Sequence, residues 1–169
     1  MGVLDALKGY APKISDDTDF GPFACAGVGV IMEGDRNTGV KESTGEQFDW
    51  FKIKYKIGTV VEGDVDLVGR YDSLSYSMTD KTWDSGKTTA GADNFIKLMN
   101  NLLTMGYEFI QPKDCTEEEL YNAMTIHLQG LSDKTFNVRC SVTKAGNQGR
   151  KVVDKIIIRE AKKDEDIPF

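Results

Sequence analysis

The sequence has only three cysteines and a single histidine among its 169 residues. Cys25, Cys115 and Cys140 are widely spaced and never form a Cys-x-x-Cys pair, a pattern typical of a reducing compartment. With His127 as the one histidine, a zinc site is not expected. The sequence therefore predicts neither a disulfide framework nor a metal or other cofactor.

Long hydrophobic runs are also missing. No apolar stretch approaches the roughly 20 residues that span a bilayer, and the first residues lack the basic and apolar segments of a signal peptide. The length suits one domain, and 40% hydrophobic with 28% charged residues is typical of a globular protein. We expect a cytoplasmic protein with no membrane contact, made of an N-terminal extension (1–20), one domain (21–160) and a C-terminal tail (161–169).

The chain has no excess of positive charge, and its formal net charge is -6. Residues 1–20 hold two lysines against four aspartates, and three consecutive acids stand at 164–166. The segment between them is therefore nearly neutral, and a nearly neutral domain can still carry a local basic surface.

Alternating apolar residues or a β-rich composition predict five strands, at 23–32, 48–57, 65–77, 136–142 and 152–159. Residues 33–47 are polar and glycine-rich and are predicted to form a long exposed loop. Apolar residues at helical spacing predict a helix over 93–105, and a capping box at Thr116 and Glu119 predicts a second short helix toward Leu128.

Three strands, the helical segment and two further strands resemble the OB-fold, a mainly β, five-stranded Greek-key barrel. Other small barrels fit the same pattern. The OB-fold binds oligonucleotides or oligosaccharides across one face, so the resemblance indicates where a ligand would lie and not which ligand it is.

The strand at 48–57 has the clearest alternation in the chain. One set of alternate residues is apolar and is expected to face the core, and the other set is Phe48, Trp50, Lys52, Lys54 and Lys56. Aromatic rings can stack on bases, while lysines spread along about 13 Å of strand can neutralise phosphates. This combination predicts a surface that binds single-stranded nucleic acid.

Further candidates extend this surface: Arg70 and Tyr76 on the third strand, Lys81, Trp83 and Lys87 in the segment after it, and Arg139 on the fourth strand. A structural alternative remains open. The lysines could instead prevent pairing at a sheet edge, and Phe48 and Trp50 could be buried under the loop at 33–47.

The sequence ends in three acids and an apolar tip, Asp164, Glu165, Asp166, Ile167, Pro168 and Phe169. Such a segment cannot fold alone, but its ring could fill a pocket while an arginine pairs with the terminal carboxylate. It resembles the acidic C-terminal tip of bacterial single-stranded DNA-binding proteins. The resemblance implies recruitment of replication, recombination and repair proteins.

The rest of the chain departs from that bacterial family, because the long Gly/Gln/Pro-rich linker is missing. A compact OB domain with an acidic tail is similar to the single-stranded DNA-binding proteins of bacteriophages, which implies action in the cytoplasm of a bacterial host. No catalytic motif is present, so we expect a binding protein that coats single strands and not an enzyme.

Two alternatives stay open at this point: an accessory protein that anneals strands in recombination, and an adaptor that engages the receptors of such tips without touching DNA. The sequence also leaves the oligomeric state open, and a homo-oligomer is one option.

Overall fold

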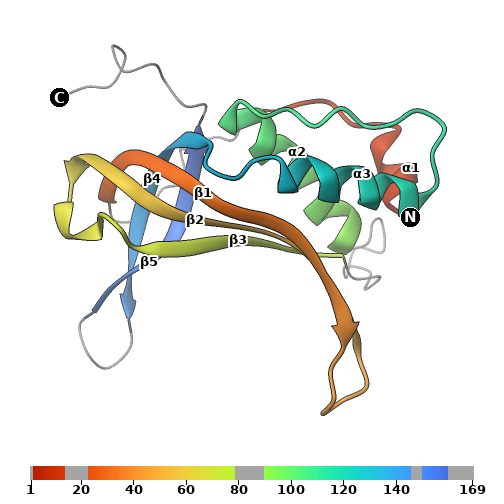
Figure 1. Cartoon of the computed structure of the whole chain (residues 1–169), viewed down its shortest axis with the longest axis horizontal. Helices are drawn as coiled ribbons and strands as arrows, with labels where there is room; N and C mark the ends of the chain where they lie inside the picture. Colours follow the sequence, from red (N-terminus) through yellow and green to blue (C-terminus); the bar gives the residue numbers. More distant parts are fainter. Residues whose placement is uncertain (1, 14–22, 79–89, 146–149, 160–169) are drawn as a thin grey trace.

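The computed structural model describes residues 2–13, 23–78, 90–145 and 150–159 (Figure 1). Five antiparallel strands form one sheet in the order β3-β2-β1-β4-β5. The strands are β1 (Phe23–Val40), β2 (Gln47–Gly63), β3 (Tyr71–Ser77), β4 (Thr135–Ala145) and β5 (Arg150–Arg159). The helices are α1 (Val3–Leu7), α2 (Ala90–Met105) and α3 (Glu117–Gln129), with a 3-10 turn at Val65–Leu67. The prediction of a mainly β protein is confirmed.

The polar segment at 33–47 is not a long loop, and that prediction is wrong. Residues 33–40 continue β1 and pair with β2 in the order Glu33 with Lys54 through to Val40 with Gln47, so only a short turn separates the two strands. Several of these residues are exposed. The outer part of β1 therefore lacks the apolar alternation that is typical of a strand with one buried face. The third predicted strand is also shorter than expected, because residues 65–67 form the 3-10 turn.

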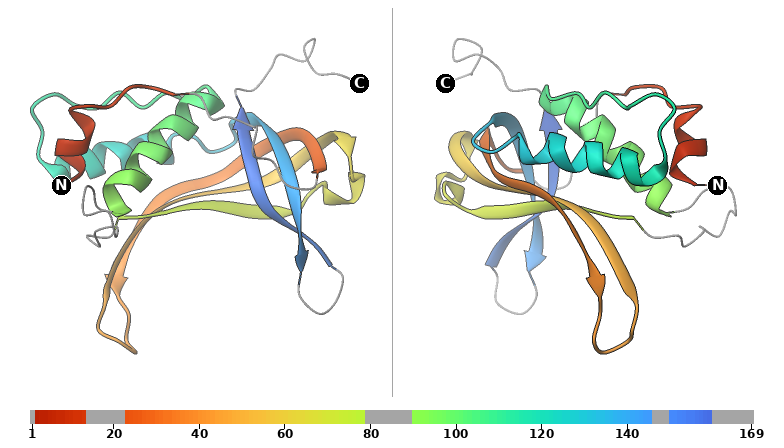
Figure 2. Two further views of the ribbon diagram at one scale, coloured as in Figure 1. Left: turned by 180° about the vertical axis from the view of Figure 1, so that it is seen from behind. Right: turned by 45° about the vertical axis from the view of Figure 1, so that its right-hand side comes forward.

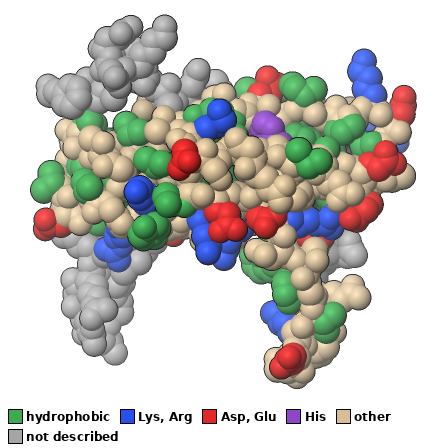
Figure 3. All heavy atoms as spheres, in the orientation of Figure 1, with side chains coloured by type: hydrophobic (Ala, Val, Ile, Leu, Met, Phe, Trp, Pro, Cys, Tyr) green, Lys and Arg blue, Asp and Glu red, His purple; other side chains and the backbone are tan. Residues whose placement is uncertain are grey.

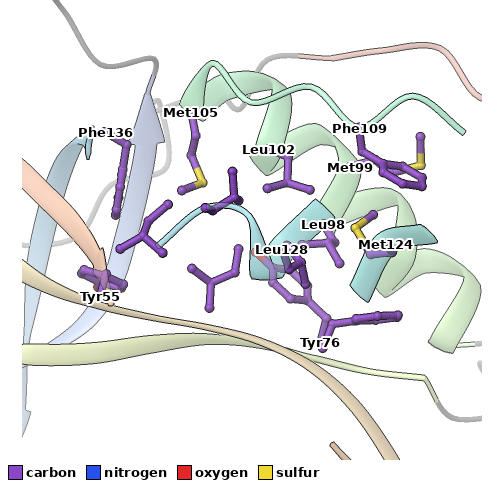
Figure 4. Packing of buried hydrophobic residues seen from close by; sticks show 14 of the residues in the cluster. Tyr55, Tyr76, Leu98, Met99, Leu102, Met105, Phe109, Met124, Leu128 and Phe136 are labelled. Carbon is purple, nitrogen blue, oxygen red and sulfur yellow. The ribbon is translucent and has the colours of Figure 1, made fainter. Parts of the chain in front are cut away.

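The hydrophobic core lies between one face of the sheet and the helices α2 and α3 (Figure 4). Phe51, Ile53 and Tyr55 of β2 are fully buried, as their alternation predicts. Phe51 packs edge-on against Phe95 of α2, with the ring centroids 6.0 Å apart. The apolar face of α2 therefore covers the apolar face of β2, and the opposite face of β2 points away from the helices.

Helix α3 begins where the sequence predicts. Thr116 has an extended backbone, and its hydroxyl accepts a hydrogen bond of 3.1 Å from the backbone N–H of Glu119. The hydroxyl of Thr116 also donates to the carboxylate of Glu119. The expected N-cap at Thr116 is thus confirmed, and it fixes the start of the helix that lies along β1.

The first helix lies within the segment expected as an extension. Val3 and Leu7 of α1 are buried in the core cluster, and Tyr10 donates a 2.8 Å hydrogen bond to Asn100 of α2. Residues 2–13 therefore belong to the folded body.

Two hairpins project from the body on the side away from the helices (Figures 1 and 2). One is the outer part of β1 and β2, which we call the β1–β2 arm (residues 36–50), and the other is formed by β4 and β5. Among the described helices, none combines the length and the apolar character needed to cross a membrane. The sheet thus has one face buried by helices and one face flanked by projecting hairpins.

Candidate nucleic-acid interface

The face of β2 that points away from the helices carries Phe48, Trp50, Lys52, Lys54 and Lys56, which we call the lysine face. The strand geometry brings these five side chains together on one side, because alternate residues of a strand project in the same direction. Lys54 is exposed and Lys52 and Lys56 are partly exposed. The face is accessible along its whole length.

The two aromatic rings stand at the arm end of the lysine face. Trp50 is 37% exposed, so it is neither sealed in the interior nor free in solvent. The Phe48 ring lies over Gly39 of β1, where a Cβ atom would come within 2.7 Å of the ring. Phe48 and Trp50 line a hollow of about 270 Å³ whose other lining residues are Lys41, Glu46, Gln47, Asp49, Ser77 and Met78. An open hollow beside an exposed indole is a suitable place for a flat base.

The β3 strand adds small polar residues beside the lysines. Trp50 pairs with Ser77, Lys52 with Ser75 and Lys54 with Ser73. Residues opposite each other in an antiparallel ladder project on the same side of the sheet, so the three serines, which we call the serine row, share the lysine face's side. Their hydroxyls are neutral hydrogen-bond donors.

Tyr71 completes this row, and sequence analysis missed it. It is 66% exposed and pairs with Lys56 at the start of β3. Tyr71 therefore supplies a second accessible ring beside Lys56. This ring and Trp50 lie at opposite ends of the three lysines. Only the ladder register reveals this, because the 3-10 turn separates Tyr71 from the alternation of β2.

Tyr76 does not lie on this side of the sheet, contrary to expectation. It pairs with the core residue Phe51, is only 6% exposed, and accepts a 2.6 Å hydrogen bond from the side chain of Asn101. Burial raises the pKa of Tyr76 to about 12, with the Asn101 hydrogen bond acting in the opposite direction. The pairing of β3 with β2 decides which β3 residues face the core, and it directs Tyr76 into the core.

The remaining predicted residues lie at the margins or beyond the described residues. Arg70 is exposed and precedes β3. Arg139 is partly exposed on β4 and pairs with Ala26 of β1, which pairs with Glu62 of β2 and not with one of the lysines. Lys81, Trp83, Lys87 and the tail residues Asp164, Glu165, Asp166, Ile167, Pro168 and Phe169 lie outside the described residues. The described site therefore centres on β2 and β3.

On the other side of the lysines, β1 contributes carboxylates. Lys54 pairs with Glu33 and Lys52 with Asp35, and we call these two carboxylates the acidic row. Among the described residues, no carboxylate oxygen lies within the 4.0 Å ion-pair distance of the Lys52 or Lys54 ammonium group. Figure 3 shows basic and acidic side chains close together along the margin from which the arm projects. The surface is therefore of mixed charge, with acids on its β1 side.

Arg36 holds the base of the arm against α3. Its guanidinium donates to both carboxylate oxygens of Asp49, at 2.9 and 2.8 Å, and to Glu118 at 3.1 Å. It also lies 4.9 Å from the centroid of the Tyr121 ring. These hydrogen bonds, the one to Asp49 above all, raise the pKa of Arg36 further above its ordinary value. Arg36 thus positions the arm and is already fully engaged by acids.

No protein-family model matches this chain, and no curated protein sequence matches it. Within the described part of the chain, no cluster of three or more histidine, cysteine or acidic side chains could hold a metal ion.

Proposed function

We propose that this protein binds single-stranded DNA on the lysine face, with little preference for sequence. The observation that carries the proposal is the shared direction of the Trp50 ring and three lysine side chains on the open side of β2. For Trp50, the exposed fraction of 37% and the pairing of residues 33–40 in β1 speak against burial beneath a loop.

The chemistry favours unpaired bases. A partly exposed indole offers a stacking surface worth about 1–3 kcal/mol per base, and duplex bases are already stacked on their neighbours. Lysines along the same strand neutralise phosphates and release counterions. Stacking and charge together hold a single strand without reading the edges of its bases, which accounts for the lack of sequence preference.

The proposal includes the OB-fold as the architecture. Its support is the strand order β3-β2-β1-β4-β5 with α2 and α3 between β3 and β4 along the chain, an order in which β1 pairs with both β2 and β4. In OB-folds the ligand lies across the second and third strands, and in this chain those are the strands that carry the lysines, the serines and Tyr71.

The proposal assigns the acidic end to protein partners. Its support is the sequence at Asp164–Phe169, where acids precede an Ile-Pro-Phe tip like that of bacterial single-stranded DNA-binding proteins. In this account the protein coats and protects single strands in the cytoplasm of a bacterial host, and its tip recruits replication, recombination and repair proteins. The role is one of binding and not of catalysis.

The direct test is a variant that removes the ring and two charges, Trp50→Ala with Lys52→Ala and Lys54→Ala. We expect its affinity for oligo-dT to fall at least about a hundredfold, because one stacking contact of about 1–3 kcal/mol and two phosphate contacts are lost. The dependence of log affinity on log salt should also flatten by about 0.7 for each lost contact. Fluorescence anisotropy with a labelled oligonucleotide measures both quantities.

A matched control removes two lysines elsewhere, Lys97→Ala with Lys113→Ala, on α2 and on the loop before α3. This control changes the net charge equally and should leave the affinity nearly intact. If wild type, variant and control all fail to bind oligo-dT, the adaptor hypothesis, in which the tip acts without DNA contact, replaces the proposal.

A further inference from the structure

We propose that Glu33 and Asp35 make the lysine face selective for single strands over duplex DNA by repelling a second phosphate backbone. The inference rests on the proposed function and adds the residues that set its specificity. The two carboxylates lie directly opposite Lys54 and Lys52 in the β1–β2 ladder. Like the lysines, they therefore project to the side of the sheet that the helices leave open.

Within the acidic row, Asp35 is held in place by two hydrogen bonds. Oδ1 of Asp35 accepts a 2.8 Å hydrogen bond from the backbone N–H of Arg36 and a 3.2 Å hydrogen bond from Nε2 of Gln129 at the end of α3. Glu33, Asp35 and Asn37 line a hollow of about 150 Å³ together with Lys52 and Lys54. The carboxylates thus border the place where a phosphate would meet the ammonium groups.

The two sides of the lysines differ in charge. The β3 side offers the neutral hydroxyls of the serine row, whereas the β1 side offers two negative charges. Neighbouring strands lie about 4.8 Å apart, so a phosphate displaced from the lysines toward β1 comes close to a carboxylate. A single phosphate backbone is therefore confined to one path along the sheet surface, between β2 and the serine row, which we call the lane.

One lane is enough for a single strand but not for a duplex. The backbones of a duplex are separated by grooves about 6 and 12 Å wide, so a duplex that used both backbones on the sheet would need a second lane. Toward β1, the second backbone would meet the acidic row. Toward β3, it would find no further strand to lie on, because β3 is the edge strand of the described sheet. Repulsion of the wrong ligand gives specificity that attraction by the lysines alone cannot.

The experiment compares wild type with the Glu33→Gln, Asp35→Asn double variant. Both substitutions keep the shape of the side chain, and the amide introduced by Asp35→Asn still has an oxygen that can accept from Arg36 and Gln129. A control variant, Glu108→Gln with Asp114→Asn, removes the same charge from the loop between α2 and α3. The probes are oligo-dT and a blunt duplex of the same length, titrated at one salt concentration.

We expect both affinities of the double variant to rise, and the affinity for the duplex to rise at least about fivefold more than that for oligo-dT. The control should leave the ratio of the two affinities unchanged. An unchanged ratio in the double variant, with oligo-dT still bound, overturns this inference alone. A wild-type protein that does not bind oligo-dT overturns the proposed function, and the inference falls with it.

Discussion

The aromatic residues at the two ends of the lysine face illustrate how side-chain direction is set. Trp50 and Tyr71 come from different strands, yet both project to the open side, since Trp50 pairs with Ser77 and Tyr71 with Lys56 in one ladder. The two pairs stand at opposite ends of that ladder, which corresponds to about 20 Å of strand. A single strand of DNA laid along the lysines would meet a ring at each end.

Tyr71 is therefore expected to contribute to binding. Tyr71→Ala should weaken the affinity for oligo-dT by about fivefold to a hundredfold, because it removes one stacking surface. Tyr71→Phe, which keeps the ring and removes the hydroxyl, should bind almost as wild type. Anisotropy titrations of the three proteins decide the matter, and an alanine variant with wild-type affinity would remove Tyr71 from the interface.

At the scale of single residues, the sequence predicts side-chain direction only within an unbroken strand. The alternation over Phe48–Ile57 correctly separates the buried Phe51 and Ile53 from the accessible Trp50 and Lys54. It cannot be carried across the 3-10 turn into β3. For this reason the sequence wrongly predicts Tyr76 on the open side, where it instead lies in the core, and gives no indication of the exposed Tyr71.

At the scale of elements, α3 approaches β1 closely at the acidic row. A Cβ atom on Gly34 would lie 2.5 Å from the carbonyl oxygen of Leu128, near the end of α3. Only a residue without a side chain permits this contact. The close approach also brings Gln129 within hydrogen-bond distance of Asp35.

Gly34→Ala should consequently destabilise the fold. The methyl group must push the end of α3 away from β1, at a cost of about 1–3 kcal/mol in the free energy of unfolding. Urea unfolding followed by circular dichroism measures the loss. Gly9→Ala is the control, because nothing lies within 4 Å of its added Cβ. Equal stability of the Gly34 variant and wild type would contradict the close packing described for β1 and α3.

Elements with strong local signals were predictable, and those without them were not. The helical spacing of Phe95, Leu98 and Leu102 and the capping box at Thr116 correctly locate α2 and α3. The outer part of β1 has no such signal, because both faces of the β1–β2 arm are rich in polar residues. Its strand conformation depends on cross-strand pairing with β2, which composition alone does not reveal.

At the scale of the whole molecule, the two faces of the sheet differ in what they contact. One face is buried by α2 and α3 (Figures 1 and 4). The other carries the lysine face between the serine and acidic rows. The sequence predicts that such a division exists, because the alternation of β2 has one apolar and one cationic set. It does not predict which residues of β1 and β3 flank the lysines, since strand register is a property of the assembled sheet.

The division is also compatible with the proposed binding of a polyanion by a chain whose net charge is -6. Attraction depends on the local arrangement of charges and rings, and the total charge mainly influences long-range encounter. The affinity for single strands should therefore be moderate and should decrease steeply as salt is added.

The most direct test of the central claim is the fluorescence of Trp50 during titration with oligo-dT. The variant Trp83→Phe leaves Trp50 as the sole tryptophan of the chain, so any change reports on the lysine face. We predict saturable quenching at low salt and a lower affinity at higher salt, because a base stacks on the indole while lysines hold the phosphates. Binding of the oligonucleotide with unchanged Trp50 fluorescence, or failure of the wild-type protein to bind at either salt concentration, would contradict the account.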